Sequence, residues 1–272
     1  MTRAPVAGGY PERELDKLIL ARLTGRPLVL SFDVDGTLAP IVAHPSLARV
    51  PEATRGIIAS LVTTRGVIVI LVSGRAASDA KRVVGVDHVW TVGNHGAEVI
   101  DPTGDTIVDA AVSGYTEAMA RTAQTLEPLI APIRGVLLEN KRLTLSIHYR
   151  AADEGVVPRL RSIVEGVAAE QGLIVTEGKK VIEIRPPIGV NKGTAISRLI
   201  GDLGGFNRGA SVLFAGDDVT DEDAFRFLRE HHPAAITICI GDRSDTAAEF
   251  RFRDTERLRV LLERVARAAA EP

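Results

Sequence analysis

The sequence predicts an α/β protein with a doubly wound, mostly parallel sheet and a smaller α+β domain inserted into it. Five short apolar runs alternate with segments of helical periodicity, which is the order of elements in a parallel sheet. A polar residue follows each run at the point where a strand would end. Between the third and fourth runs, apolar and polar residues alternate singly, which is typical of antiparallel strands with one covered face.

The apolar runs predict buried strands because they are short and bounded by turn residues, and the run at residues 67–72 is rich in β-branched residues. They lie at residues 28–32, 67–72, 88–92, 211–215 and 235–240. The segments between them place apolar residues at helical spacing, as Leu15, Ile19 and Leu23 do in the first. The predicted helices lie at residues 11–23, 51–64, 76–84, 191–202, 220–230 and 258–270. Because crossovers between parallel strands are right-handed, a doubly wound sheet is expected.

The central stretch predicts a separate module of order α-β-β-α-β-β. Its predicted helices are residues 114–130 and 153–171, and its clearest alternating segments are residues 143–149, 173–176 and 180–185. Leu145 and Ile147 share one strand face, whereas Ser146 and His148 share the other. We therefore expect a core domain of residues 1–110 and 187–272 and an inserted domain of residues 111–186.

Composition limits the class of partner. The 272 residues are 45% hydrophobic and 25% charged, with a formal net charge of -2, so nothing indicates a nucleic-acid partner. No apolar run approaches the roughly 20 residues that span a bilayer, and the first residues lack the apolar region of a secretory signal. The single Cys239 cannot form an intrachain disulfide, which fits a reducing compartment. We expect a cytoplasmic protein without a membrane partner, and a monomer is favoured.

Two carboxylates follow the first strand. Asp33 and Asp35 are two residues apart, so in an extended segment their side chains point the same way. Such a pair repels unless a positive charge lies between its members, and hard oxygen ligands suit Mg²⁺. Gly36 allows a sharp turn after them. The alternative is a solvated turn that closes the strand.

Two further segments carry groups that suit phosphate. Ser73, Gly74 and Arg75 follow the second strand and precede a helix, where a hydroxyl and N–H groups can bind an anion; a plain helix cap is the alternative. Lys192 opens a helix, where the helix dipole disfavours a positive side chain. The alternative is a surface lysine, which costs little at this position.

The run GDDVTDED at residues 216–223 holds five acids in seven positions. Thr220 is expected to cap the helix, and acids of its first turn are stabilised by the helix dipole. That explanation does not account for Asp217 and Asp218, which lie at the end of the preceding strand. There a metal ion shared with Asp33 is the simplest source of compensation.

Four motifs in this order, DVDGTL, SGR, GVNKG and GDDVTDED, resemble those of the haloacid dehalogenase (HAD) phosphatase superfamily. The resemblance implies a Rossmann-like core with Asp33 as the nucleophile and Asp35 as the general acid/base. It further implies Mg²⁺ ligands and phosphate-binding residues. The implied ligands are Asp33, Asp35 through its main-chain carbonyl, and Asp217, with Asp218 and Asp221 as outer-sphere partners; phosphate would contact Ser73, Gly74, Arg75 and Lys192.

Finer features resemble the trehalose-6-phosphate phosphatase family within that superfamily. They are GNHGAE at residues 93–98, HYR at 148–150 and EGKKVIEIRP at 177–186, together with the whole GDDVTDED run. The resemblance makes the inserted domain a mobile cap that binds the sugar, with hinges near residues 109–114 and 185–189. Its sugar-binding residues would be Glu139, Lys141, Lys179 and Glu183, with Asn94 and His95 at the interface between core and cap. Arg142, His148 and Arg185 are secondary candidates.

Departures and alternatives remain. Val34 stands where an aromatic residue is frequent, and residues 76–78 lack a usual proline. The charged residues of the inserted domain could form a solvated, salt-bridged face instead. Other functions consistent with the motifs are phosphatases for sucrose-phosphate or mannosyl-phosphoglycerate, a small-molecule phosphatase of relaxed specificity, and a non-catalytic sugar-phosphate-binding protein.

Overall fold

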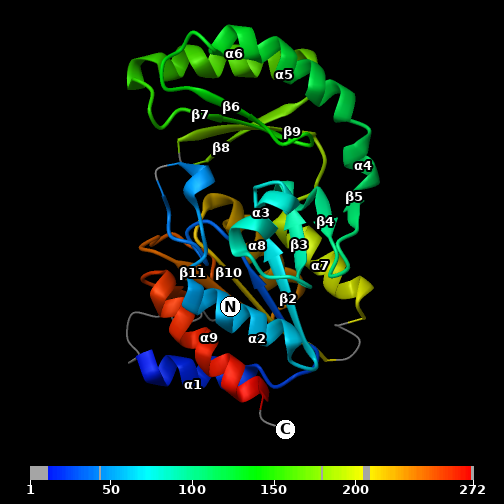
Figure 1. Ribbon diagram of the computed structural model, residues 1–272, viewed down its shortest axis with the longest axis vertical. Coiled ribbons are helices and arrows are strands. Elements are labelled where there is room, and N and C mark those ends of the chain that lie inside the picture. The colour runs from blue at the N-terminus through cyan, green and yellow to red at the C-terminus, as the bar shows by residue number, and fades with distance from the viewer. Residues whose placement is uncertain (1–11, 43, 179, 205–208, 271–272) are drawn as a thin grey trace. The chain divides into compact units, whose positions relative to one another are not determined.

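The computed structural model describes residues 12–42, 44–178, 180–204 and 209–270 (Figure 1). It divides into two compact units. The α/β unit consists of residues within Met1–Ile107 and Val190–Pro272, and the α+β unit is Val108–Gly189. Two positions named above, Pro11 at the first helix and Lys179 among the sugar-binding candidates, lie outside the described residues.

The α/β unit is built on an eight-stranded sheet of order β12-β11-β10-β1-β2-β3-β4-β5. The strands are β1 (Leu28–Phe32), β2 (Val67–Val72), β3 (Trp90–Gly93), β4 (Glu98–Ile100), β5 (Thr106–Val108), β10 (Ser211–Gly216), β11 (Ile236–Ile240) and β12 (Phe250–Phe252). All pairs from β12 to β3 are parallel, and β3 pairs with β4 antiparallel. The five predicted strands are confirmed, and β4, β5 and β12 were not predicted because three residues are too few to show a period.

Helices cover both faces of this sheet, as a doubly wound fold requires. Buried residues of α1 (Glu12–Arg22), α2 (Glu52–Thr63), α3 (Ala77–Val84) and α9 (Thr255–Ala270) form one apolar core, and those of α7 (Lys192–Asp202) and α8 (Val219–His231) form another. Strand β1 divides its side chains between the two cores. Leu28, Leu30 and Phe32 face the first core, whereas Val29 faces the second. The period-two pattern of a buried strand therefore fixes which helices each residue meets.

The order of the strands fixes where a site can form. From β1 the chain moves to β2 and β3 on one side, and it later returns to β10 and β11 on the other. This reversal makes the boundary between β1 and β10 a topological switch point, where open α/β sheets bind ligands. The register pairs Phe32 with Ala215, and the N–H of Asp33 donates to the Ala215 carbonyl at 2.9 Å. Asp33 and Asp217 therefore follow neighbouring strand ends.

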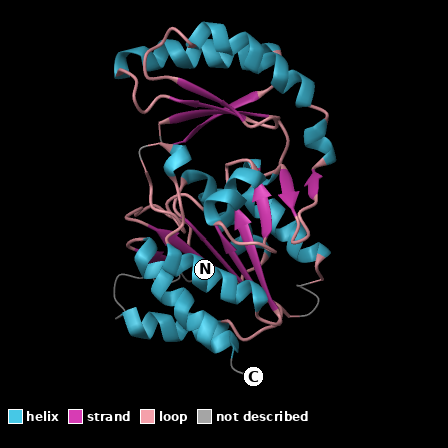
Figure 2. Cartoon of the chain, in the orientation of Figure 1, coloured by secondary structure: helices cyan, strands magenta, loops and turns pink. Residues whose placement is uncertain are grey.

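The α+β unit has its own sheet and core. Its strands are β6 (Leu137–Asn140), β7 (Leu145–His148), β8 (Ile174–Gly178) and β9 (Val181–Arg185), in the antiparallel order β6-β7-β9-β8. Helices α5 (Thr116–Ile130) and α6 (Val157–Glu170) lie on one face of that sheet (Figure 2). A short helix, α4 (Ala110–Ser113), precedes α5. Leu145 and Ile147 face the helices, as the alternating pattern predicts. In the described part of the chain, no helix is long and apolar enough to cross a bilayer.

A buried charge cluster joins the helices α1 and α9. Asp16 is 1% exposed and accepts hydrogen bonds from Arg257 and Arg264. Arg257 is itself buried and lies over the ring of Phe252, with 4.2 Å between the guanidinium carbon and the ring centroid. Removing one partner of a buried ion pair leaves a charge uncompensated.

We expect Asp16→Ala to lower the free energy of unfolding by about 3 kcal/mol, because buried Arg257 would lose its buried carboxylate and keep the exposed Glu12 at 3.7 Å. Glu14→Ala in the same helix is the control, since the exposed Glu14 pairs with the exposed Lys17 at 2.9 Å and its loss should change stability by less than about 0.5 kcal/mol. Urea unfolding measures both, and equal effects of the two substitutions would contradict this account.

Candidate active site

Lys192 lies at the centre of a buried charge cluster at the carboxyl edge of the α/β sheet. Its Nζ lies 2.6 Å from Asp33 Oδ1 and 2.8 Å from Asp221 Oδ1. All three residues are less than 5% exposed. Asp33, Asp217 and Asp221 each offer an oxygen within 4.8 Å of the other two. Three carboxylates therefore lie close to one ammonium group, which is paired with Asp33 and Asp221.

Local sequence explains how Lys192 reaches this position. Asn191 caps α7, since its side chain accepts the Thr194 N–H at 3.0 Å and its own N–H donates to Thr194 Oγ1 at 3.0 Å. A Cβ at Gly193 would lie 2.8 Å from the Phe227 Cβ, so glycine permits the close approach of α7 to α8. Lys192 is placed against the helix dipole, and the carboxylates offset that cost.

Asp221 connects the start of α8 to the charge cluster through hydrogen bonds. Its Oδ2 accepts the N–H groups of Asp217 and Asp218, each at 3.0 Å, while its Oδ1 accepts Lys192. The cap of α8 is Asp218, whose side chain accepts the Thr220 N–H at 2.7 Å. The prediction that Thr220 caps this helix was wrong, because the helix begins one residue earlier and its capping box uses Asp218 and Asp221.

The residues present fit a divalent cation. Within the described residues, Asp217 Oδ1 is buried and has no hydrogen-bond partner. Gly36 has φ +88°, and a Cβ there would lie 2.1 Å from Asp217 Oδ2, so only glycine leaves room for this carboxylate. Three carboxylates against the one ammonium of Lys192 leave two negative charges in excess. Hard oxygen donors of this kind suit Mg²⁺.

The pKa values of the clustered carboxylates reflect this excess of negative charge. Burial, with the charges of Asp221 and Asp218, raises the pKa of Asp217 to about 7. Burial also raises the pKa values of Asp33 and Asp221, although Lys192 opposes both shifts. Burial alone would lower the pKa of Lys192, but Asp221 and Asp33 outweigh it and raise that pKa. Lys192 therefore stays charged, but its single positive charge cannot neutralise all three carboxylates.

Asp35 is held by Arg75. The Arg75 Nε and Nη2 donate to the two oxygens of Asp35 at 2.6 and 2.7 Å, and its Nη1 donates to Asp79 at 2.6 Å. Nη2 also donates to the Pro45 carbonyl at 3.0 Å. The Asp35 carboxylate is outside the acidic group formed by Asp33, Asp217 and Asp221. Arg75, predicted to bind phosphate, thus has carboxylates on its guanidinium in this structure.

Ser73 and the GNHGAE turn lie next to one another. The side chain of Ser73 is buried and accepts the Arg75 N–H at 3.1 Å. The N–H groups of Asn94 and His95 donate to the carbonyls of Arg75 and Ser73, at 2.7 and 3.1 Å. A Cβ at Gly74 would lie 2.5 Å from the His95 ring. These predicted residues are therefore brought together within the α/β unit.

The predicted sugar-binding residues of the α+β unit form two polar pairs. Lys141 Nζ lies 3.4 Å from Glu183 Oε1, which also accepts the Ser146 hydroxyl at 2.7 Å. Glu139 lies 2.8 Å from His148 Nε2. Ser146 is paired in register with both Glu139 and Glu183, so the three share one face of the sheet. Lys179 lies outside the described residues.

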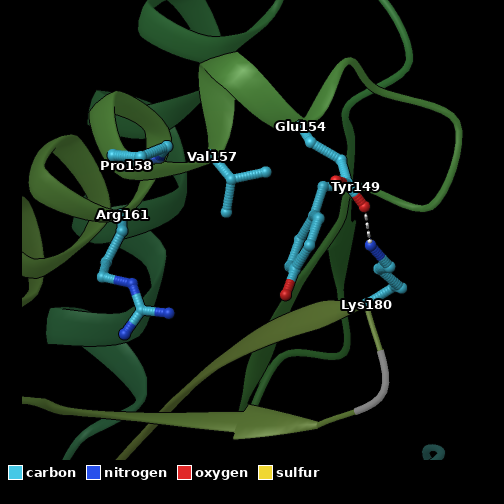
Figure 3. Close-up of a pocket in the computed structure, with 6 residues that line it drawn as sticks. All are labelled: Tyr149, Glu154, Val157, Pro158, Arg161 and Lys180. Carbon is cyan, nitrogen blue, oxygen red and sulfur yellow. Dashed lines mark hydrogen bonds and ion pairs between the residues drawn. The ribbon is translucent and has the colours of Figure 1, made fainter.

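Among the described residues, none of the predicted site residues lines a cavity of about 530 Å³ in the α+β unit. Its lining residues are Tyr149, Glu154, Val157, Pro158, Arg161 and Lys180. Figure 3 shows the Tyr149 ring between Arg161 and the Glu154–Lys180 ion pair, which measures 2.9 Å. Arg161 is paired with Glu177. The charged side chains that line this cavity are therefore already paired.

Sequence reasoning missed three supporting residues. Asp79 lies in α3, four residues after Arg75. This spacing could have suggested the Arg75–Asp79 ion pair. Ser146 was placed on the polar strand face, but its bond to Glu183 depends on strand pairing. Glu98 accepts both the Asn94 side-chain amide, at 2.9 Å, and the Ala77 N–H, at 2.7 Å; no spacing rule indicates this.

Comparison with known proteins is consistent with this geometry. The family model described as trehalose-phosphatase matches residues 31–256. A Mycobacterium tuberculosis protein described as an uncharacterized glycosyl hydrolase is 35% identical over 210 residues, which are 76% of this chain but only 16% of that protein. The probable trehalose-phosphate phosphatase 3 of Oryza sativa subsp. japonica is 31% identical over 91% of this chain and 71% of its own.

A solved structure supports the same relation. The crystal structure of a trehalose-6-phosphate phosphatase related protein superimposes with a TM-score of 0.77 and 28% identity. The match covers 88% of this chain and 97% of that chain. The likeness therefore extends over both units described above.

The raised pKa of Asp217 predicts a pH dependence of stability. Because the folded chain favours protonated Asp217, this contribution is present below about pH 4 and is lost as pH rises through about 7. We expect the melting temperature of Asp217→Asn, relative to the parent, to rise by at least about 3 °C between pH 5 and pH 8 in chelator. Mg²⁺ should stabilise the parent more at pH 8 than at pH 5.

Asp223→Asn is the matched control for this measurement, because Asp223 is exposed on α8. Its melting temperature relative to the parent should not change with pH. A difference between Asp217→Asn and the parent that is the same at every pH would show that burial does not protonate Asp217.

Proposed function

Because the chain belongs to the trehalose-phosphatase family, we propose that it is a Mg²⁺-dependent phosphatase that hydrolyses trehalose 6-phosphate to trehalose and phosphate. The observation that carries this proposal is the buried bridge of Lys192 between Asp33 and Asp221. Asp217 offers an oxygen within 4.8 Å of oxygens of both carboxylates, so a single metal ion could contact all three. We further propose a cytoplasmic monomer that acts in trehalose biosynthesis.

In the first chemical step, an oxygen of Asp33 attacks phosphorus and the bond from phosphorus to the sugar oxygen breaks. Asp35 gives its proton to the departing sugar oxygen. Lys192 is 2.6 Å from Asp33 and stays charged, so it compensates the negative charge that builds up beside the nucleophile. The Ser73 hydroxyl would donate to a phosphoryl oxygen, with Gly74 and Arg75 completing the proposed phosphate contact.

In the second step, water attacks the phosphorus of the aspartyl-phosphate and Asp35 takes the proton of that water. The bond between phosphorus and Asp33 breaks, which releases phosphate and restores the carboxylate. Bound Mg²⁺, held by Asp33, Asp217 and the Asp35 carbonyl, would neutralise charge on the phosphoryl group. Asp221 holds Lys192 and the N-terminal turn of α8 in place, and Asp218 caps that helix.

Sugar recognition belongs, in this proposal, to the polar face of the α+β sheet. A disaccharide is neutral and rich in hydroxyl groups, so charged side chains that both donate and accept hydrogen bonds suit it. Lys141 and Glu183 lie 3.4 Å apart and could bind adjacent hydroxyls. Glu139 and Lys179 complete the proposed set, with Asn94 and His95 in the α/β unit.

Substrate specificity and catalysis are tested together by phosphate release from trehalose 6-phosphate, glucose 6-phosphate and sucrose 6-phosphate. We expect trehalose 6-phosphate to exceed the others by about 100-fold in kcat/KM, which corresponds to about 2.8 kcal/mol of transition-state binding. Chelator should abolish the release, and Asp33→Asn should lower kcat by at least about 1000-fold because no nucleophile remains.

Asp223→Asn should keep the activity of the parent. Equal turnover of all three compounds would indicate a phosphatase of relaxed specificity, and preference for sucrose 6-phosphate would indicate another sugar-phosphate phosphatase. Binding without any release of phosphate would indicate a non-catalytic protein.

The proposed sugar contacts predict a substrate-dependent loss. Lys141→Met or Glu183→Gln should lower kcat/KM for trehalose 6-phosphate by about 10- to 100-fold, since each removes a charged hydrogen bond of about 1.5–3 kcal/mol. The same variants should change turnover of p-nitrophenyl phosphate by less than about threefold, because that substrate has no sugar. The control is Lys180→Met, which removes an exposed ion pair of the same unit. Equal losses on both substrates would contradict a role in sugar recognition.

A further inference from the structure

The turn that follows β3 has an unusual backbone. Asn94 and His95 have φ values of 49° and 57°, in the left-handed region that residues other than glycine seldom adopt. Two such residues in succession persist only where the surroundings hold them. The turn is buried, and its position between β3 and β4 places it beside the Ser73–Arg75 segment.

Glu98, the first residue of β4, holds this turn from within. Its Oε1 accepts the side-chain amide of Asn94 at 2.9 Å. The same oxygen accepts the backbone N–H of Ala77 at 2.7 Å. The residue before α3 is Ala76, which makes no side-chain cap hydrogen bond, so a carboxylate from another strand caps this helix.

The two elements that Glu98 joins enclose the Ser73–Arg75 segment. On one side, Asn94 and His95 donate their N–H groups to the carbonyls of Arg75 and Ser73. On the other side, α3 begins two residues after Arg75. Gly74 lies against the His95 ring, with no room for a Cβ. Loss of the Glu98 carboxylate would therefore affect the Ser73–Arg75 segment from both sides, through Asn94 and through the start of α3.

From these contacts we infer that Glu98 is a positioning residue that holds the Ser73–Arg75 segment in the conformation that binds the phosphoryl group. The inference rests on the proposed function, because it takes that segment to be the phosphate contact. Glu98 touches neither the acidic cluster nor Lys192 in the contacts described. It acts through Asn94 and Ala77, and, through Arg75, on the orientation of Asp35.

The test measures binding of inorganic phosphate by calorimetry in the presence of Mg²⁺. We expect Glu98→Ala to weaken phosphate binding about tenfold, because both hydrogen bonds are lost. Glu98→Gln keeps an oxygen able to accept both hydrogen bonds and should stay within about threefold of the parent. Asp254→Ala is the control, since Asp254 accepts the Arg257 N–H at 2.8 Å at the start of α9 and its loss removes a helix cap elsewhere in the same unit.

Amide hydrogen exchange supplies a readout that does not depend on activity. In Glu98→Ala, the amides of Ala77 and Asn94 should exchange at least about tenfold faster, while those of β1 and β10 keep the protection of the parent. Unchanged phosphate affinity in Glu98→Ala, or loss of protection throughout the sheet, would overturn the inference. If the parent binds phosphate but hydrolyses no sugar phosphate, the proposed function fails and the inference about Glu98 stands.

Discussion

The crowding of three carboxylates around one buried lysine is the constraint on which the rest of the α/β unit depends. Buried charges are costly unless they are paired and hydrogen-bonded. Lys192 compensates part of the charge of Asp33 and Asp221, and the carboxylate of Asp217 lies beside them with an unpartnered oxygen among the described residues. A core of apolar residues would be more stable at this position. The cluster therefore fits a divalent cation, which would offset the excess negative charge.

The fold reduces the cost of this cluster through backbone groups. The N–H groups at the start of α8 are fixed donors, and Asp218 and Asp221 accept them. Glycine makes room where the carboxylates come closest to the chain. A Cβ at Gly216 would lie 2.3 Å from the Asp221 side chain, and one at Gly36 would lie 2.1 Å from Asp217. The same donors and dipoles stay in place during a reaction, so the site is preorganised.

Prediction from sequence succeeded where a signal was long or lay at a strand end. Five short apolar runs marked the parallel strands, and the residues after them, including Asp33 and Asp217, come together because parallel strands end at one edge. The three-residue strands gave no period. Contacts between distant side chains gave no signal either, since nothing in the spacing of Asp35 and Arg75, 40 residues apart, predicts that they pair.

The pairing of Asp35 with Arg75 limits how the proposed reaction can proceed. Both oxygens of Asp35 accept hydrogen bonds from the guanidinium. A protonated carboxyl group is a weaker acceptor than a carboxylate, so protonation of Asp35 would weaken its pair with Arg75. Arg75 likewise cannot give the same N–H groups to Asp35 and to a phosphoryl oxygen. Phosphoryl oxygens that take up the Arg75 donors would therefore compete with Asp35 for the guanidinium. In the proposed reaction, proton transfer by Asp35 and phosphate binding by Arg75 therefore both depend on this one pair.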